Sequence, residues 1–183
     1  LVGSEMCIRD SDYITNLSCG GDFMRTFTVS FFGHRQIEAP FQVESQLEKL
    51  ISQLLQQNEF VEFLVGREGE FDQLVSSTIR RCKRNIRDDN SALIWVMPYP
   101  TAEFRDNESS FLDYYDEIEV CEQAAAAHYK SAFQIRNREM VDRSDMVIVY
   151  IEHSSGGAYQ TFRYVQKSGK KYINIAAESE GFR

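Results

Sequence analysis

Residues 131–165, SAFQIRNREMVDRSDMVIVYIEHSSGGAYQTFRYV, decide the fold class of this 183-residue chain. The segment predicts a helix that ends near Arg143, a short apolar strand over residues 146–151, and a second helix that begins near Ala158 after Gly156-Gly157. A β-branched run that is buried on both faces and leads through a glycine turn into a helix is typical of a parallel α/β sheet. Such a turn presents free backbone N–H groups at a helix N-terminus, which suits a phosphate.

The same alternation of strands and helices extends over the rest of the chain. Four further apolar or β-rich runs are expected to be strands, at residues 26–32, 62–65, 92–97 and 172–176. Together they predict an α/β domain with a doubly wound, mainly parallel sheet of about five strands and flanking helices. Residues 98–127 form a long acidic and aromatic connection, a length that is typical of a lid or a binding loop.

Length and composition limit the number of domains and the kinds of partner. Residues 23–183 are expected to form a single domain, and residues 1–22 a non-native or disordered leader, because residues 1–12 resemble a translated sequencing adapter. The hydrophobic content of 43% is ordinary for a soluble protein. The net charge of −8 argues against a non-specific nucleic-acid binder but leaves a local basic pocket open, and no nucleic-acid partner is expected. No apolar run is long enough to span a membrane, so no membrane partner is expected.

The cysteines do not form a recognisable metal-binding or disulfide pattern. Cys7, Cys19, Cys82 and Cys121 are scattered, without a CxxC pair or a histidine at ligand spacing. This pattern favours reduced thiols in a cytoplasmic protein. We expect no metal and no cofactor.

Glycines follow three of the expected strands and indicate where a ligand binds. The turns are Gly33-His34-Arg35, Gly66-Arg67-Glu68-Gly69 and Gly156-Gly157. In an open parallel sheet, ligands bind outside the carboxyl ends of the strands. Three glycine turns at equivalent positions therefore predict a phosphate-containing ligand. None of the turns matches the GxGxxG or GxxxxGK[ST] pattern, so neither a standard dinucleotide dehydrogenase nor an NTPase is expected.

Several side chains beside these turns have two open interpretations. His34, next to Arg35, either contacts the ligand or packs structurally. Glu70 and Asp72, in the first turn of a helix, either cap that helix or bind a ribose diol. The candidates for stacking on a base, which equally suit plain packing, are Tyr99 and Tyr115.

The turns and helices together resemble a known superfamily. The series GHR after a strand, GREGEFD, PYP, YYDE, IRNREMVDRSD and GGAYQTF is similar to the SLOG superfamily, over residues 26–176. This Rossmann-like group includes the LOG, or lysine-decarboxylase-like, phosphoribohydrolases. The resemblance implies a Rossmann-like fold and a pocket for a nucleotide or an ADP-ribose-like ligand.

The resemblance also assigns roles to individual positions. Arg136 occupies the place of the catalytic arginine, and Gly156-Gly157 the place of the paired glycines. Other positions depart from the LOG pattern: Asn137 replaces a lysine, and Phe162 and Arg163 stand where the catalytic glutamates are expected. Since hydrolysis of an N-glycosidic bond needs a carboxylate, these departures weaken the enzyme interpretation.

These observations lead to one preferred function and two alternatives. The preferred function is sensing or sequestration of a small nucleotide derivative, with no nucleic-acid partner and with a homodimer expected by analogy. The alternatives are an N-glycoside hydrolase or transferase acting on nucleotides and a protein–protein assembly module. The catalytic residues are unknown, with the candidates Arg136, Glu70, Asp72 and Asp116. The predicted ligand-binding residues are Gly33, His34, Arg35, Gly66, Arg67, Gly69, Glu70, Asp72, Tyr99, Tyr115, Arg136, Asn137, Gly156, Gly157, Ala158 and Thr161.

Overall fold

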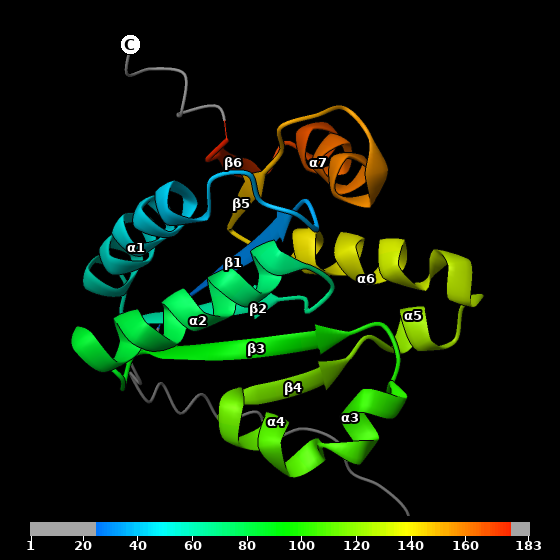
Figure 1. The fold of residues 1–183 in the computed structure, drawn as a ribbon, viewed down its shortest axis with the longest axis horizontal. Helices are drawn as coiled ribbons and strands as arrows, with labels where there is room; N and C mark the ends of the chain where they lie inside the picture. The colour runs from blue at the N-terminus through cyan, green and yellow to red at the C-terminus, as the bar shows by residue number, and fades with distance from the viewer. Residues whose placement is uncertain (1–24, 177–183) are drawn as a thin grey trace, which may run out of the picture.

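A sheet of six parallel strands forms the centre of the molecule, in the order β4-β3-β2-β1-β5-β6 (Figure 1). The computed structural model describes residues 25–176, and the expected leader over residues 1–22 lies outside this range. The strands are β1 (Thr26–Gly33), β2 (Phe60–Val65), β3 (Ser91–Met97), β4 (Glu117–Val120), β5 (Met146–Tyr150) and β6 (Lys171–Asn174). The predicted α/β class with a doubly wound parallel sheet is confirmed.

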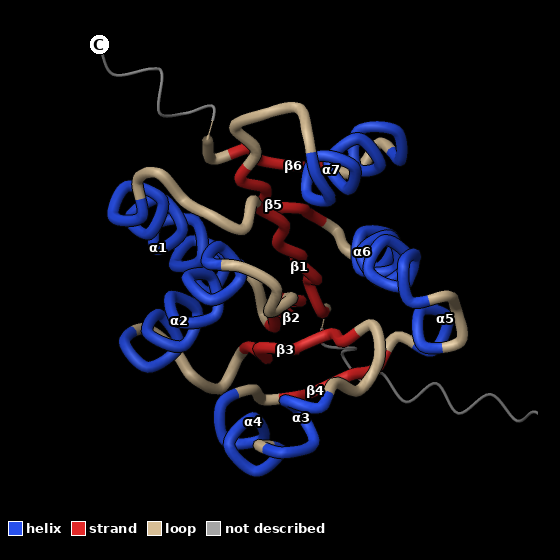
Figure 2. Tube along the Cα trace, turned by 45° about the vertical axis from the view of Figure 1, so that its right-hand side comes forward, coloured by secondary structure: helices blue, strands red, loops and turns tan. Residues whose placement is uncertain are grey.

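Helices cover both faces of the sheet (Figure 2). On one face lie α1 (Pro40–Gln57) and α2 (Glu70–Asn85), which pack against each other. On the other face lie α5 (Glu122–Ala125), α6 (Tyr129–Arg143) and α7 (Gly156–Ser168). Two short helices, α3 (Ala102–Asp106) and α4 (Glu108–Tyr114), lie beside β3 and β4.

The two faces of the sheet bury separate hydrophobic cores, which explains the apolar strands. Val29 and Phe63 face the core that α1 and α2 cover, whereas Leu64 and Val149 face the core under α6 and α7. Strands buried on both faces read as continuous apolar runs. The helix α1 contributes one stripe of buried residues at helical spacing, Val43, Leu47, Ile51, Leu54 and Leu55.

The structure differs from the sequence prediction in the segment between residues 98 and 127. This segment was expected to be a lid or a binding loop, but it forms three short helices and the edge strand β4, so the sheet has six strands rather than about five. An aromatic cluster holds α3 and α4 in place, because the Trp95 ring lies 5.9 Å from Phe104, 5.0 Å from Phe111 and 5.3 Å from Tyr115. Packing of these large rings stabilises the segment as part of the core.

The strand order places a crevice at the carboxyl ends of β1 and β5. The chain adds β2, β3 and β4 on one side of β1 and then crosses to add β5 and β6 on the other side. The loops that follow β1 and β5 therefore leave the sheet toward opposite faces, which opens a space between them. No helix within residues 25–176 is long and apolar enough to span a membrane.

Candidate functional site

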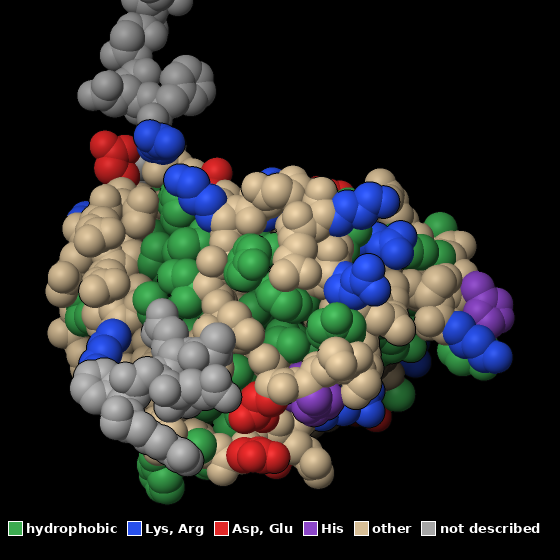
Figure 3. Space-filling view, turned by 90° about the horizontal axis from the view of Figure 1, so that it is seen from above, with side chains coloured by type: hydrophobic (Ala, Val, Ile, Leu, Met, Phe, Trp, Pro, Cys, Tyr) green, Lys and Arg blue, Asp and Glu red, His purple; other side chains and the backbone are tan. Residues whose placement is uncertain are grey.

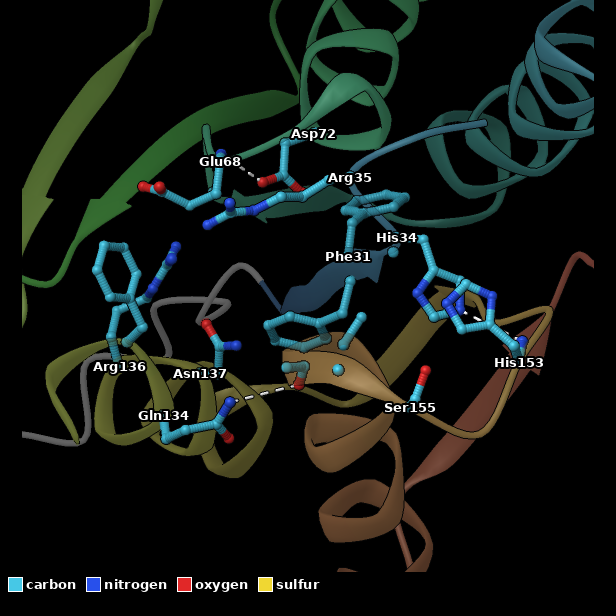
Figure 4. A pocket seen from close by; sticks show the side chains of 17 residues that line it. Phe31, His34, Arg35, Glu68, Asp72, Gln134, Arg136, Asn137, His153 and Ser155 are labelled. Atoms are coloured by element: carbon cyan, nitrogen blue, oxygen red, sulfur yellow. Dashed lines mark hydrogen bonds between the residues drawn. The ribbon is translucent and has the colours of Figure 1, made fainter. Parts of the chain in front are cut away.

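A pocket of about 360 Å³ opens at this crevice (Figure 4). The loops after β1, β2 and β5 form one part of its wall, and the N-terminus of α7 and the side of α6 form the rest. Ten of the predicted ligand-binding residues line it: Gly33, His34, Arg35, Gly66, Asp72, Arg136, Asn137, Gly156, Gly157 and Ala158.

The loops after β1 and β5 bring a histidine pair to the pocket, and the loop after β1 also brings an exposed arginine. His34 is buried, and its ring stacks on the exposed ring of His153 with centroids 3.6 Å apart. The backbone N–H of His153 donates to Nε2 of His34 at 3.4 Å. Burial and, second, the neighbouring His153 lower the pKa of His34, which favours its neutral form. The side chain of Arg35 extends across the pocket toward Glu68 (Figure 4).

The first turn of α2, which follows the loop after β2, supplies a carboxylate with a raised pKa. Oδ2 of Asp72 accepts the backbone N–H of Glu68 at 2.8 Å. Burial raises the pKa of Asp72 to about 6, although this N–H and the charge of Arg136 act in the opposite direction. Desolvation is therefore the dominant effect on this carboxyl group.

Arg136 forms the charged floor of the pocket. Its side chain is only 3% exposed, and Nη1 donates to the carbonyl of Val96 at 3.0 Å. Its Nε has no hydrogen-bond partner among the described residues. A buried guanidinium N–H that lacks a partner costs free energy, so this group is suited to an anion that enters the pocket.

Three of the predicted glycines are explained by close packing of the protein itself. A Cβ on Gly33 would lie 2.4 Å from the Phe71 ring, and a Cβ on Gly69 would lie 2.6 Å from Cα of Arg35. A Cβ on Gly66 would lie 2.8 Å from Nη1 of Arg136 and from Oδ2 of Asp72. Glycine at these positions lets the loops and the charged side chains approach each other.

The N-terminus of α7, in contrast, is open toward the pocket. Gly156 has a φ of 84°, and a Cβ on it would meet no atom of the described residues within 4 Å. A Cβ on Gly157 would have only the side-chain amide of Gln134 nearby. The first turn of α7 carries no acidic residue, whereas the first turn of α2 carries Glu70 and Asp72. Of these two helix N-termini, α7 therefore offers the better site for an anion.

Side chains from α6 hold this first turn of α7 in place. Nε2 of Gln134 donates to the carbonyl of Gly157 at 3.4 Å. Nδ2 of Asn137 donates to Oγ1 of Thr161 at 2.9 Å, and that hydroxyl donates to the same carbonyl at 3.0 Å. Thr161, a predicted ligand residue, is buried behind the turn and acts through this network.

The remaining predicted residues lie outside the pocket. Arg67 pairs with Glu103 at 3.0 Å and lies over the Phe111 ring, and Oε2 of Glu70 accepts the N–H of Ile37 at 3.0 Å. Tyr99 packs edge-on against Phe133. Gly69 packs closely against Arg35, and Tyr115 packs against Trp95 in the hydrophobic core.

Asp116 lies at the opposite edge of the sheet from the pocket. It accepts the N–H of Leu93 and pairs with the buried Lys83, near the start of β3 and β4. The strands separate it from the carboxyl-end crevice. Among the four candidate catalytic residues, only Arg136 and Asp72 line the pocket.

Sequence reasoning missed seven residues that line the pocket, namely Phe31, Phe32, Glu68, Phe133, Gln134, His153 and Ser155. Two features of the sequence could have indicated three of these residues. His153 and Ser155 stand between a strand and Gly156-Gly157, and Phe133 lies one helical turn before Arg136. Over residues 25–176 no group of three or more His, Cys, Asp or Glu side chains could hold a metal ion.

The groups that line the pocket are chemically suited to an anion. The pocket combines an open helix N-terminus, an exposed arginine and a buried arginine with one carboxyl group of raised pKa. These groups suit a phosphate, and the Phe133 and His153 rings offer faces for a planar group.

Comparisons with known proteins give a likeness in structure only. No family model and no curated protein sequence matches the chain. Among solved structures, DNA processing protein A from Helicobacter pylori, described for its single-stranded DNA binding mode, superposes with a TM-score of 0.57 at 16% identity, over 83% of this chain and 70% of that one. DNA processing protein A from Streptococcus pneumoniae gives a TM-score of 0.49 at 14% identity, over 86% of this chain and 62% of that one.

This likeness corrects the predicted function and partner. A small nucleotide derivative was expected as the ligand, for sensing, sequestration or N-glycoside cleavage, and nucleic acid was excluded; the Helicobacter pylori protein with this fold binds single-stranded DNA. The exclusion was wrong because a net charge averages over the whole chain, whereas a nucleic acid responds to the charge of one surface. The likeness at 16% identity shows that this chain has a Rossmann-like fold in common with that protein.

Proposed function

We propose that this chain binds single-stranded nucleic acid and seats one nucleotide in the pocket at the carboxyl ends of β1, β2 and β5. The observation that carries the proposal is Arg136, a buried guanidinium whose Nε lacks a partner among the described residues, on the pocket floor. An anion in the pocket would add to the compensating charge that Asp72 and Glu68 provide for this guanidinium.

A backbone phosphate would lie at the first turn of α7. The N–H groups of that turn are free to donate, and no acidic residue competes in the turn. Arg35 is exposed at the rim and can reach a phosphate from the opposite wall. A charge-assisted hydrogen bond of this type contributes about 1.5–3 kcal/mol.

The base would stack on aromatic rings of the pocket wall. Phe133 is half-buried and is held edge-on by Tyr99, with ring centroids 5.9 Å apart. The exposed His153 ring is supported from behind by His34. Stacking on an aromatic side chain contributes about 1–3 kcal/mol per base and tolerates any base, so we expect little sequence preference.

A single strand fits this site better than a duplex. A base can enter this pocket only after it has left its neighbours in the stack, which costs least in a single strand. The Helicobacter pylori protein with the same fold binds single-stranded DNA, which supports this choice of partner.

We further propose that the chain is a member of the SLOG superfamily. A cytoplasmic location and a homodimer stay predictions.

Fluorescence polarisation with labelled oligothymidylate, oligouridylate and a duplex of equal length tests the proposal. We expect both single strands to bind more tightly than the duplex, with an affinity that falls as salt rises. Arg35→Ala should weaken single-strand binding about fivefold, whereas Arg84→Ala, an exposed arginine near the end of α2 outside the pocket, should not.

Two outcomes would contradict the proposal. The first is no binding of any single strand at low salt with protein at about 100 µM, which is the weak end of non-specific binding. The second is binding that responds equally to the Arg35 and Arg84 variants, since this would mean that the pocket is not involved.

A further inference from the structure

The C-terminal part of the chain has a charge opposite to that of the whole. The complete sequence has 28 acidic and 20 basic residues, yet residues 154–176 include Arg163, Lys167, Lys170 and Lys171 and no Asp or Glu. A solvated helix face normally mixes both signs, since opposite charges three or four residues apart stabilise a helix. The absence of acidic residues here therefore needs an explanation.

Two of these cations form a stripe that begins at the pocket. Gly156, Gln160, Arg163 and Lys167 follow one another at intervals of four, three and four residues, so they share one face of α7. All four are exposed. The stripe spans the twelve residues 156–167, which are eleven steps of 1.5 Å, or about 16 Å along the helix. It therefore leads directly away from the open first turn of the helix.

Neither cation of the stripe has a partner in the described part of the chain. Over residues 25–176, no ion pair and no side-chain hydrogen bond involves Arg163 or Lys167. The two like charges stand four residues apart, which costs a few tenths of a kcal/mol of helix stability. A polyanion on this face would remove that repulsion.

An exposed aromatic ring packs against the side of α7, about 100° around the helix axis from Arg163. Tyr172 on the edge strand β6 is 42% exposed. Its ring and the ring of Phe162 on α7 make an edge-to-face contact, with centroids 5.2 Å apart and ring planes at 85°. Figure 3 shows a group of Lys and Arg side chains without Asp or Glu among them, beside exposed hydrophobic side chains. Cations interleaved with aromatic rings are typical of surfaces that bind single strands.

We propose that this face of α7 (Gln160, Arg163 and Lys167), together with Tyr172 of β6 on the adjacent side of the helix, is a second contact surface for the nucleic-acid strand. The inference rests on the proposed function, because the strand would reach this surface from the nucleotide in the pocket. Arg163 and Lys167 pair with successive backbone phosphates, and Tyr172 stacks against a base. Binding at the pocket alone needs only a few nucleotides, whereas binding here needs a longer strand.

The test compares two oligothymidylates. The short strand has about 4 nucleotides, at the lower end of the usual range of single-strand site sizes, and the long strand has about 20, beyond the upper end. The variant is Arg163→Glu with Lys167→Glu. The matched control is Lys49→Glu with Arg84→Glu, which changes the net charge equally on exposed positions of α1 and α2. Circular dichroism and thermal melting check that each variant is folded.

We expect the α7 variant to weaken the long strand on the order of tenfold at 0.1 M salt and to change the short strand less than about threefold. The slope of log K against log salt should fall by about 1.4, because each single-strand phosphate contact contributes roughly 0.7. Tyr172→Ala should weaken the long strand, and Tyr172→Phe should not.

Each other outcome overturns the inference in a recognisable way. If the α7 variant binds both strands with the same affinity as the wild type, the proposed binding at the pocket is still supported, but this surface does not contact nucleic acid. If the α7 variant and the control weaken the long strand equally, only net charge matters. If the variant weakens both strands equally, the effect comes from the pocket. If wild type binds neither strand, the proposed function fails as well.

Discussion

Replacing Gly157 by alanine separates the role of the α7 N-terminus in folding from its role in binding. Gly157 has an ordinary helical φ, and a Cβ there would lie 3.4 Å from Nε2 of Gln134, which is ordinary contact. Alanine is more favourable than glycine within a helix by about 0.5–1 kcal/mol. The variant should therefore be more stable, with a Tm about 2–4 °C higher.

The same methyl group should weaken nucleic-acid binding. The Cα–Cβ bonds of a helix tilt toward its N-terminus, so this Cβ projects toward the space where the phosphate would approach the N–H groups. Loss of one charge-assisted hydrogen bond costs about 1.5–3 kcal/mol, which corresponds to roughly tenfold or more in Kd. Fluorescence polarisation with a single-stranded oligonucleotide measures the affinity, and calorimetry measures the Tm.

Gly169→Ala is the matched control at the other end of α7. Gly169 has a φ of 68°, so alanine should be strained there and lower the stability by about 1–2 kcal/mol while binding is unchanged. An unchanged affinity of Gly157→Ala, in a protein that is folded and more stable, would refute the placement of the phosphate at this turn.

Three further predictions concern stability. Gly66→Ala should lower the free energy of unfolding in urea by about 1–3 kcal/mol, because its Cβ would crowd Arg136 and Asp72; an unchanged value would mean that this pair relaxes freely. The folded-state pKa of Asp72 is about 6 against an ordinary 3.8, so the folded protein binds this proton more tightly and loses stability as pH rises from about 4 to 6, by at most about 3 kcal/mol. Asp72→Asn should lack this part of the pH dependence, and parallel curves for the two proteins would contradict the assignment. Lys83→Met should cost about 2 kcal/mol, because it removes the bonds from Nζ to Asp116 and to the carbonyl of Ser91, and it should leave nucleic-acid binding intact.

Local patterns in the chain were sufficient to predict most of the sheet. The run over residues 146–150 is apolar because both of its faces are covered, and the stripe of α1 repeats at helical spacing, so each could be recognised without its neighbours in space. The strand β4 was missed because Glu117–Val120 is short, half acidic and half exposed. Its strand conformation comes from pairing with β3, a contact that no local pattern encodes.

The candidate site was predicted in part for a similar reason. The topology of a parallel sheet places every strand end at one edge, so His34, Asp72 and Gly156 could be expected near one another. The burial of Arg136, the lack of a partner for its Nε among the described residues and the stacking of His153 depend on side chains from separate elements, and the sequence carries no signal of such contacts.

By itself, the sequence determined the α/β class, the parallel sheet and the edge of the sheet at which the candidate pocket opens, because these follow from hydrophobic period and from glycine at strand ends. Tertiary structure decided which glycines pack against the protein and which leave a helix N-terminus open, since that depends on atoms brought together from distant residues. It also decided where charge gathers. The net charge of −8 is a sum over the chain, whereas the exposed cations of α7 face solvent together only because the helix places them on one side.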